Sequence, residues 1–227
     1  MILAGGKGER LRPLTTDRPK PMILLAGKPI LEYQIEWLRG QGVTDVVLLC
    51  GYLKDVVSSY FGDGSPWGVR ITYSVESEPL GRGGAFKKGF ELVPPDAPFV
   101  IGTNGDNVTD QPLAPLIRSH RRTGAVATMM LTPMVSPFGV ARTGRGTCIK
   151  GFDEKPRLPY WLNAGVYVLS RQFFEMLPEK GDHETTLFPQ LAECGGLRGY
   201  KSRAYWKGID TLKDLSEVEA HLKGRGK

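Results

Sequence analysis

Cysteine is scarce in this sequence, and its three copies, Cys50, Cys148 and Cys194, lie far apart along the chain. An odd number of cysteines without close spacing excludes a disulfide framework and a cysteine-based zinc site, and it fits a reducing compartment. No run approaches the roughly 18 apolar residues that a membrane span needs, so no membrane association is expected. Met1 leads directly into a glycine-rich loop, so no secretory signal is expected either. These absences together predict a cytoplasmic protein.

A strong excess of one charge is also missing. Thirty basic and 24 acidic residues give a net charge of +6, with both signs mixed along the chain. This excess is too small to indicate a nucleic-acid partner, but it suits small anionic substrates. The 227 residues are 41% apolar and contain no internal repeat, low-complexity segment or clear linker. These features favour one α/β domain.

The most informative stretch is the glycine-rich amino terminus. A short apolar stretch leads into Gly5, Gly6 and Gly8, and the cationic residues Arg10 and Lys20 follow. Glycines allow backbone N–H groups to approach an anion, and cationic side chains bind phosphate oxygens, so the stretch predicts a polyphosphate cradle. It is not a P-loop, because no Gly-Lys-Ser/Thr follows, and it lacks the third glycine of a dinucleotide fingerprint. The glycines alone are equally compatible with an ordinary loop.

The longer pattern is more specific than the glycines alone. Leu3-Ala-Gly-Gly-x-Gly-x-Arg-Leu-x-Pro-Leu-Thr15, followed by Lys20-Pro21, resembles the signature of the sugar-1-phosphate nucleotidylyltransferases. The resemblance implies a Rossmann-like three-layer α/β sandwich with a mostly parallel mixed sheet, as in nucleotide-diphospho-sugar transferases. It implies catalytic roles for Arg10 and Lys20. The nucleotide-binding residues that it implies in this stretch are Leu3, Ala4, Gly5, Gly6, Gly8, Arg10 and Lys20.

Hydrophobic patterning supports this fold class. The unbroken apolar runs at 46–50 and 99–101 predict buried parallel strands, and the first strand is expected to hold only about three or four residues. Further strands are expected at 69–73, 125–131, 139–142, 148–152, 164–169 and 200–205, and helices at 30–40, 53–61, 85–92, 113–120, 184–193 and 212–222. Strands and helices alternate to about residue 131. We therefore expect a single domain, 1–227, with a nucleotide-binding half at 1–131 and a sugar-phosphate-binding half with the closing helix at 132–227.

Two aspartates are candidate magnesium ligands. Asn104-Gly105-Asp106 follows a predicted buried strand and resembles the metal-binding segment of the family, with Asn104 and Gly105 near the nucleotide and Asp106 catalytic. A triphosphate needs Mg²⁺ to screen its charge, and one or two carboxylates suit that ion. The alternative is an ordinary Asn-Gly-Asp turn. Asp210 resembles the second metal ligand, although Gly208 stands at the usual aspartate position. The alternative is that Asp210 caps the closing helix.

A second glycine-rich segment, 76–85, resembles the base-reading loop of the family. The resemblance implies nucleotide contacts from Glu78, Leu80 and Gly81, and a carboxylate such as Glu78 can accept hydrogen bonds from guanine. A solvated glutamate in a loop before a helix is the alternative. Arg82 stands where a small residue is usual, which leaves the choice of base open.

The sugar-phosphate residues implied by the resemblance lie in the second half. Gly139, Glu154, Lys155 and Asn163 occur in the order of the family motifs. Glu154 and Asn163 can bond sugar hydroxyls, and Lys155 can hold the phosphate.

The implied activity is transfer of a nucleotidyl group to a sugar 1-phosphate. GTP with mannose 1-phosphate is the preferred pair, in a short form without a carboxy-terminal β-helix. The alternatives are a glucose-1-phosphate cytidylyl-, thymidylyl- or uridylyltransferase and an N-acetylmuramate-1-phosphate uridylyltransferase. A non-catalytic nucleotide-sugar sensor is the alternative from another class. The sequence leaves the oligomeric state open, and a homodimer is compatible with it.

Overall fold

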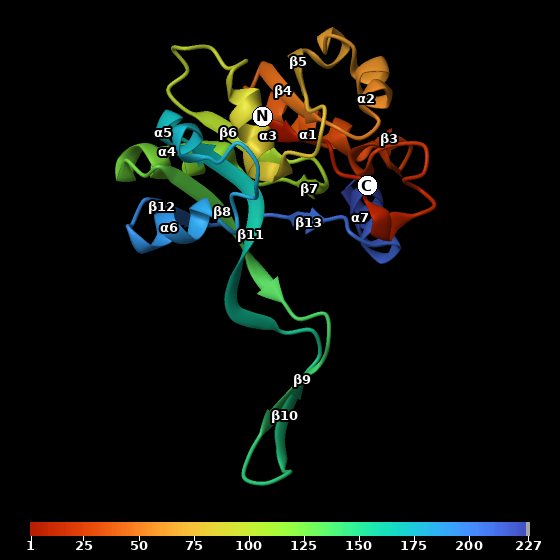
Figure 1. The fold of residues 1–227 in the computed structure, drawn as a ribbon. Helices are drawn as coiled ribbons and strands as arrows, with labels where there is room; N and C mark the ends of the chain where they lie inside the picture. Colours follow the sequence, from red (N-terminus) through yellow and green to blue (C-terminus); the bar gives the residue numbers. More distant parts are fainter. Residues whose placement is uncertain (226–227) are drawn as a thin grey trace.

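A seven-stranded mixed sheet forms the centre of the computed structural model, which describes residues 1–225 (Figure 1). Within this sheet, β11 runs antiparallel to its neighbours β6 and β8, while the other neighbouring pairs are parallel. The predicted mostly parallel sheet is therefore confirmed. In spatial order the strands are β12 (Leu197–Lys201), β8 (Ala127–Val135), β11 (Arg157–Leu169), β6 (Val100–Asn104), β1 (Ile2–Leu3), β4 (Asp45–Cys50) and β5 (Arg70–Val75).

Helices cover both faces of the sheet, which gives the three layers that the sequence predicts. Alternate strand residues point to opposite faces, so neighbouring residues such as Leu48 and Leu49 enter different cores. Leu48 packs in the core that includes α1 (Ile30–Gly40), α2 (Lys54–Phe61) and α4 (Leu113–Thr123). Leu49 packs in the core that includes α3 (Gly81–Phe90), α5 (Arg171–Met176) and α6 (Leu187–Glu193).

A third apolar cluster fastens the closing helix α7 (Leu212–Arg225) to the amino-terminal region. Leu215 and Val218 of α7 pack with Leu11 and Leu25, so residues about 200 positions apart in the sequence become neighbours. Short elements complete this region: the 3-10 turns η1 (Glu9–Leu11) and η2 (Lys20–Met22), and the paired strands β2 (Leu24–Leu25) with β3 (Lys28–Pro29) and β7 (Asn107–Thr109) with β13 (Trp206–Gly208). A further 3-10 turn, η3 (Ser65–Trp67), lies before β5.

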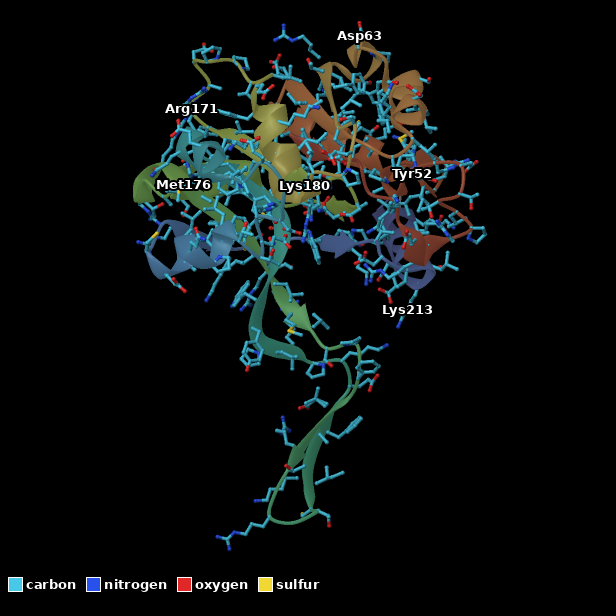
Figure 2. The ribbon with its side chains drawn as sticks, viewed as in Figure 1. Tyr52, Asp63, Arg171, Met176, Lys180 and Lys213 are labelled. Carbon is cyan, nitrogen blue, oxygen red and sulfur yellow. The ribbon has the colours of Figure 1, made fainter. Side chains whose placement is uncertain are left out.

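A hairpin arm projects from the body of the molecule. It consists of the outer ends of β8 and β11 together with β9 (Val140–Thr143) and β10 (Ile149–Asp153), and it extends well away from the sheet (Figures 1 and 2). Aromatic side chains on the arm are exposed, among them Phe138, Phe152 and Tyr160.

Several boundaries differ from those expected. The first strand holds only Ile2–Leu3. Helix α3 begins before residue 85, and α6 begins after residue 184. The strand expected at 200–205 is β12, which begins and ends earlier, at Leu197–Lys201. The long β11 begins well before residue 164, because its outer half pairs with β8 in the arm. Within the described residues, no helix combines the length and apolar character needed to cross a bilayer.

Candidate active site

The loops that follow β1 and β6 meet at the carboxyl edge of the sheet. Ala4 donates its backbone N–H to Leu49 O at 2.9 Å, and Gly105 donates to Leu3 O at 3.0 Å. A Cβ at Gly105 would lie 2.7 Å from that Leu3 oxygen, so a side chain there would separate the loops. Asp106 follows immediately. Parallel strands thus bring the glycine loop and Asp106 together, as their positions after predicted strands indicate.

Gly8 makes room for Lys20. The φ angle of Gly8 is +63°, in the region that side chains disfavour, and a Cβ there would lie 2.7 Å from Lys20 Cβ. The loop is held closed by the Lys20 N–H, which donates to Gly6 O at 3.1 Å, and by Thr15 Oγ1, which donates to Gly8 O at 3.0 Å. The aliphatic part of Lys20 therefore lies against the glycine loop, and its side chain is only 10% exposed.

The Lys20 ammonium connects both candidate metal ligands. Its Nζ donates to Asp106 Oδ2 at 2.6 Å and to Asp210 Oδ1 at 2.7 Å. Arg10 Nη2 donates to the same Asp210 oxygen at 2.8 Å, although its side chain is 74% exposed. Burial lowers the pKa of Lys20, but the two carboxylates outweigh burial, so the pKa lies above the ordinary lysine value. Four predicted site residues thus form one charged cluster.

Asp210 is not needed to cap the closing helix. Thr211 and Asp214 form a reciprocal cap at the start of α7, in which Asp214 N donates to Thr211 Oγ1 at 3.2 Å and Thr211 N to Asp214 Oδ2 at 2.9 Å. Asp214 Oδ2 also accepts the Asp210 N–H at 3.1 Å, which fixes the backbone of Asp210. The Asp210 carboxylate is therefore directed to Lys20 and Arg10, not to the helix end.

Two adjoining cavities of about 340 and 780 Å³ open at this cluster. Both are lined by Gly6, Lys20, Arg82, Asn104 and Asp106. The smaller cavity is also lined by Leu3, Gly5, Glu76 and Gly81, and the larger one by Gly8, Arg10, Asn163, Glu184 and Asp210. The cavities therefore form one cleft, with the charged cluster where they meet.

The two aspartates fit a divalent cation that prefers oxygen ligands. Their carboxylate oxygens already converge on one cationic atom, the Lys20 ammonium. The described part of the chain has no group of three or more histidine, cysteine or acidic side chains arranged around a common metal position. Two carboxylates are the number that Mg²⁺ uses when substrate phosphates supply further ligands.

The structure distinguishes the two glutamates of the segment that is predicted to contact the base. Glu78 does not line either cavity, is 67% exposed, and pairs with Lys180 at 3.1 Å. Glu76 lines the smaller cavity, and its Oε2 accepts the Leu80 N–H at 3.0 Å. Sequence reasoning missed Glu76, although its position directly after β5 is the same signal that identified Asp106 after β6.

Asn163 belongs to a hydrogen-bonded network on the wall of the larger cavity. Its Nδ2 donates to Glu184 Oε1 at 2.9 Å, which also accepts the Tyr167 hydroxyl at 3.1 Å. Arg82 Nη1 lies 2.7 Å from Glu184 Oε2, and Arg82 Nε donates to Asp182 Oδ2 at 2.7 Å. Sequence reasoning missed Glu184, because it was assigned to the start of a helix and no nearby motif indicates its distant partners.

The remaining predicted residues line neither cavity. Ala4 is buried beneath the glycine loop, and Leu80 and Gly105 shape the backbone next to the smaller cavity. Gly139, Glu154 and Lys155 lie on the arm, where a Cβ on Gly139 would contact both Phe152 and Glu154. The roles of these residues stay predictions.

Comparisons with known proteins find relatives over most of the chain. The chain is 37% identical over 225 residues to a mannose-1-phosphate guanyltransferase of Yarrowia lipolytica, covering 95% of this chain and 61% of the relative. It is 34% identical over 230 residues to a mannose-1-phosphate guanylyltransferase of Mycobacterium tuberculosis, covering 98% and 64%. The chain thus spans about three fifths of the length of these relatives.

A solved structure supports the fold independently. HddC from Yersinia pseudotuberculosis, crystallised in complex with GMP-PN, superposes with a TM-score of 0.77 at 25% identity and covers 97% of each chain. The family profile described as nucleotidyl transferase matches residues 1–224. The glycine loop, the fold and these matches together show that the chain belongs to the nucleotidyl transferase family.

Proposed function

We propose that this protein transfers a nucleotidyl group from a nucleoside triphosphate to a sugar 1-phosphate. A phosphate oxygen of the sugar 1-phosphate attacks the α-phosphorus of the nucleoside triphosphate. The bond between the α-phosphorus and the oxygen that bridges it to the β-phosphorus breaks, and pyrophosphate leaves with that oxygen. The incoming phosphate is already ionised, so the reaction needs no covalent enzyme intermediate and no general base. Catalysis then consists of positioning the reactants and stabilising charge.

The observation that carries the proposal is the position of Lys20. Its ammonium lies at the junction of two cavities, one bordered by the glycine loop and the other by Asn163 and Glu184. A triphosphate in the first cavity and a sugar phosphate in the second would bring their phosphates together at this charge. Lys20 then bridges the phosphates, and Arg10 reaches the α-phosphoryl oxygens and the leaving pyrophosphate.

We infer that Mg²⁺ acts as the cofactor, held by Asp106 and Asp210. The ion supplies charge neutralisation for the triphosphate and the developing pyrophosphate. Lys20 occupies the position between the two carboxylates in the present structure. We expect its ammonium to turn toward the phosphates once the substrate complex forms.

GTP and mannose 1-phosphate are the proposed substrates. The relatives named as mannose-1-phosphate guanyltransferases support this pair. Glu76 supports guanine, because a carboxylate in the smaller cavity can accept the N1–H and amino hydrogens of that base. Asn163, Glu184 and Arg82 present polar atoms to the sugar in the larger cavity, and Lys155 is proposed to hold the sugar phosphate.

The two glutamates provide a matched test of base recognition. Glu76→Gln keeps an oxygen for the Leu80 N–H but replaces one acceptor by a donor, so we expect kcat/KM for GTP to fall at least about tenfold. Glu78→Gln alters an exposed side chain outside the cavity and should stay within about twofold of the unmodified protein. Equal losses in both variants, or a loss only in Glu78→Gln, would assign base recognition elsewhere.

A matrix assay tests the whole proposal. Pyrophosphate release is measured with GTP, CTP, dTTP and UTP against mannose, glucose and N-acetylmuramate 1-phosphates, each with and without Mg²⁺. We expect the fastest magnesium-dependent turnover with GTP and mannose 1-phosphate. A different best pair would overturn the substrate assignment but retain the reaction. No turnover with any pair, combined with binding of nucleotide sugars by calorimetry, would favour the sensor alternative.

A further inference from the structure

Arg82 stands where the two cavities of the active-site cleft meet. Its side chain is 41% exposed, and it lines both the smaller and the larger cavity, as Lys20 does. Lys20 is proposed to bridge the phosphates, so Arg82 is a second cation at the same junction. The contacts of its guanidinium decide which ligand group it can bind.

The backbone around Arg82 is joined to the segment that carries its carboxylate partners. The Gly181 N–H donates to Leu80 O at 2.8 Å, and the Gly83 N–H donates to Gly181 O at 2.9 Å. These bonds run in both directions between the start of α3 and residues 179–184. Arg82 and its partners are therefore held in one unit, which fixes the direction of the guanidinium.

Two carboxylates hold the guanidinium of Arg82. Its Nε donates to Asp182 Oδ2 at 2.7 Å, its Nη2 donates to the same oxygen, and its Nη1 lies 2.7 Å from Glu184 Oε2. A guanidinium carries five N–H groups. These contacts use at most three of them, so one N–H on each Nη atom remains for a ligand in the cleft.

The neighbouring donors on the same wall are already used. Both hydrogens of Asn163 Nδ2 are donated, one to Glu184 Oε1 at 2.9 Å and one to the Tyr167 hydroxyl at 2.8 Å. The buried Tyr167 hydroxyl in turn donates to Glu184 Oε1 at 3.1 Å. Asn163 and Tyr167 thus keep no side-chain hydrogen for a sugar, and Arg82 is the donor that this wall offers. Glu184 Oε2 has a second lone pair with which to accept.

Charge decides between a phosphate and a hydroxyl as the group that faces Arg82. Asp182 and Glu184 together carry one negative charge more than Arg82 balances. A phosphate bound to Nη1 would lie close to Glu184 Oε2 and would be repelled by it. A hydroxyl accepts one hydrogen bond and donates another, so it suits an N–H that lies beside a carboxylate oxygen.

We propose that Arg82 and Glu184 together bind one ring hydroxyl of the sugar 1-phosphate. The hydroxyl accepts from a free Nη N–H of Arg82 and donates to Glu184 Oε2. Arg82 is thereby a specificity-determining residue for neutral sugars with a free hydroxyl at that ring position. Sugars that lack this hydroxyl, or that carry an anionic substituent in its place, are rejected. This inference rests on the proposed reaction.

A set of deoxy sugars tests the pairing. Mannose 1-phosphate is compared with its 2-, 3- and 4-deoxy analogues at saturating GTP, in the unmodified protein and in Arg82→Met. In the unmodified protein we expect kcat/KM to fall about 10- to 100-fold for the analogue without the bound hydroxyl, because an N–H and a carboxylate oxygen lose their partner. In Arg82→Met the penalty for that same analogue should shrink to about threefold or less, while the penalties for the other two analogues stay unchanged.

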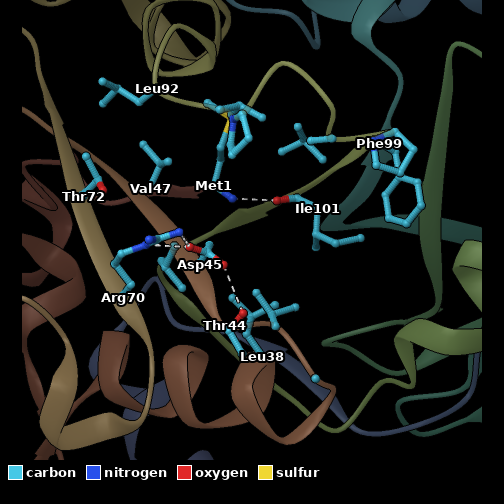
Figure 3. Close-up of a pocket in the computed structure, with 18 residues that line it drawn as sticks. Met1, Leu38, Thr44, Asp45, Val47, Arg70, Thr72, Leu92, Phe99 and Ile101 are labelled. Carbon is cyan, nitrogen blue, oxygen red and sulfur yellow. Dashed lines mark hydrogen bonds and ion pairs between the residues drawn. The ribbon is translucent and has the colours of Figure 1, made fainter.

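A matched control comes from the opposite end of the sheet. Arg70 Nε donates to Asp45 Oδ1 at 2.7 Å, and both residues line a separate cavity beside the first residues of β4 and β5 (Figure 3). Arg70→Met therefore also removes an arginine from an aspartate, and it should retain every penalty of the unmodified protein. Arg82→Gln gives the same readout as Arg82→Met should the latter fold poorly in a thermal melt.

Two results would overturn the proposal. One is an equal loss of kcat/KM for mannose 1-phosphate and all three analogues in Arg82→Met, because a purely structural role lowers every rate by the same factor. The other is the absence of a penalty for every analogue in the unmodified protein. No turnover of mannose 1-phosphate itself would count against the proposed reaction instead, and the same comparison is then made by calorimetry with GDP-mannose and its deoxy analogues.

Discussion

Lys20→Met is expected to lower kcat for pyrophosphate release by about 10²-fold or more, judged from other preorganised charges that act on a transition state. Methionine retains much of the length and apolar bulk of the lysine stem beside Gly8, but it removes the ammonium between Asp106 and Asp210. The loss should appear mainly in kcat, because the charge acts on phosphate oxygens as pyrophosphate departs. Steady-state kinetics at saturating GTP and sugar phosphate measure it.

Two further variants make this result interpretable. Lys54→Met removes an exposed lysine that pairs with Asp55 and lines neither cavity of the cleft, and it should keep full turnover. Lys20→Arg keeps the charge with a different shape and should recover part of the lost rate. Near-normal turnover in Lys20→Met, with a thermal melt that confirms folding, would contradict the role assigned to this residue.

The second large effect is the pH dependence of the unfolding free energy when Met1 carries a free amine. The amine has a pKa of 8.0 in the unfolded chain and about 5 when folded, because burial disfavours the charged form. Between these values the unfolded state binds more protons, so stability is full above pH 8 and falls as pH drops toward 5. Three pKa units correspond to about 4 kcal/mol of unfolding free energy. Urea unfolding across this range measures the change.

A narrower pH range separates the contribution of the Met1 amine to stability from that of the histidines. Burial lowers the pKa of His183 to about 4 from 6.5, so this residue adds a loss of the same sign below pH 6.5. Between pH 6.5 and 8 the amine should still account for about 2 kcal/mol. A protein with an acetylated Met1 should lose this dependence. An unchanged slope after acetylation would contradict the assignment to the amine.

Position along predicted strands allowed much of the site to be located from the sequence. Asp106 was recognised because it follows an unbroken apolar run, and parallel strands carry such residues to one edge of the sheet. Arg10 and Lys20 were recognised from the glycine loop beside them. For Asp210 the sequence allowed two interpretations, a metal ligand or a helix cap. In the structure Thr211 and Asp214 form the cap, and the Asp210 carboxylate is directed to Lys20.

Features set by distant contacts were not predictable. The start of α3 is an example, because glycines have low helix propensity, yet Gly81 begins this helix. A Cβ at Gly81 would lie 2.5 Å from Gly181 O, and the Gly83 N–H donates to that same oxygen at 2.9 Å. Close packing against a segment about 100 residues away thus decides the boundary. Glu184 was missed for the same reason, since its partners come from α3 and β11.

The cap of α7 has a consequence for the order in which the candidate site forms during synthesis. The Asp210 backbone N–H donates to the Asp214 carboxylate, so the position of Asp210 depends partly on the first turn of that helix. A nascent chain that stops before α7 carries the glycine loop, Lys20, Asp106 and Asp210, but it lacks the Asp214 carboxylate that accepts the Asp210 N–H. The charged cluster is therefore expected to gain its full set of contacts only after translation has passed the first turn of α7.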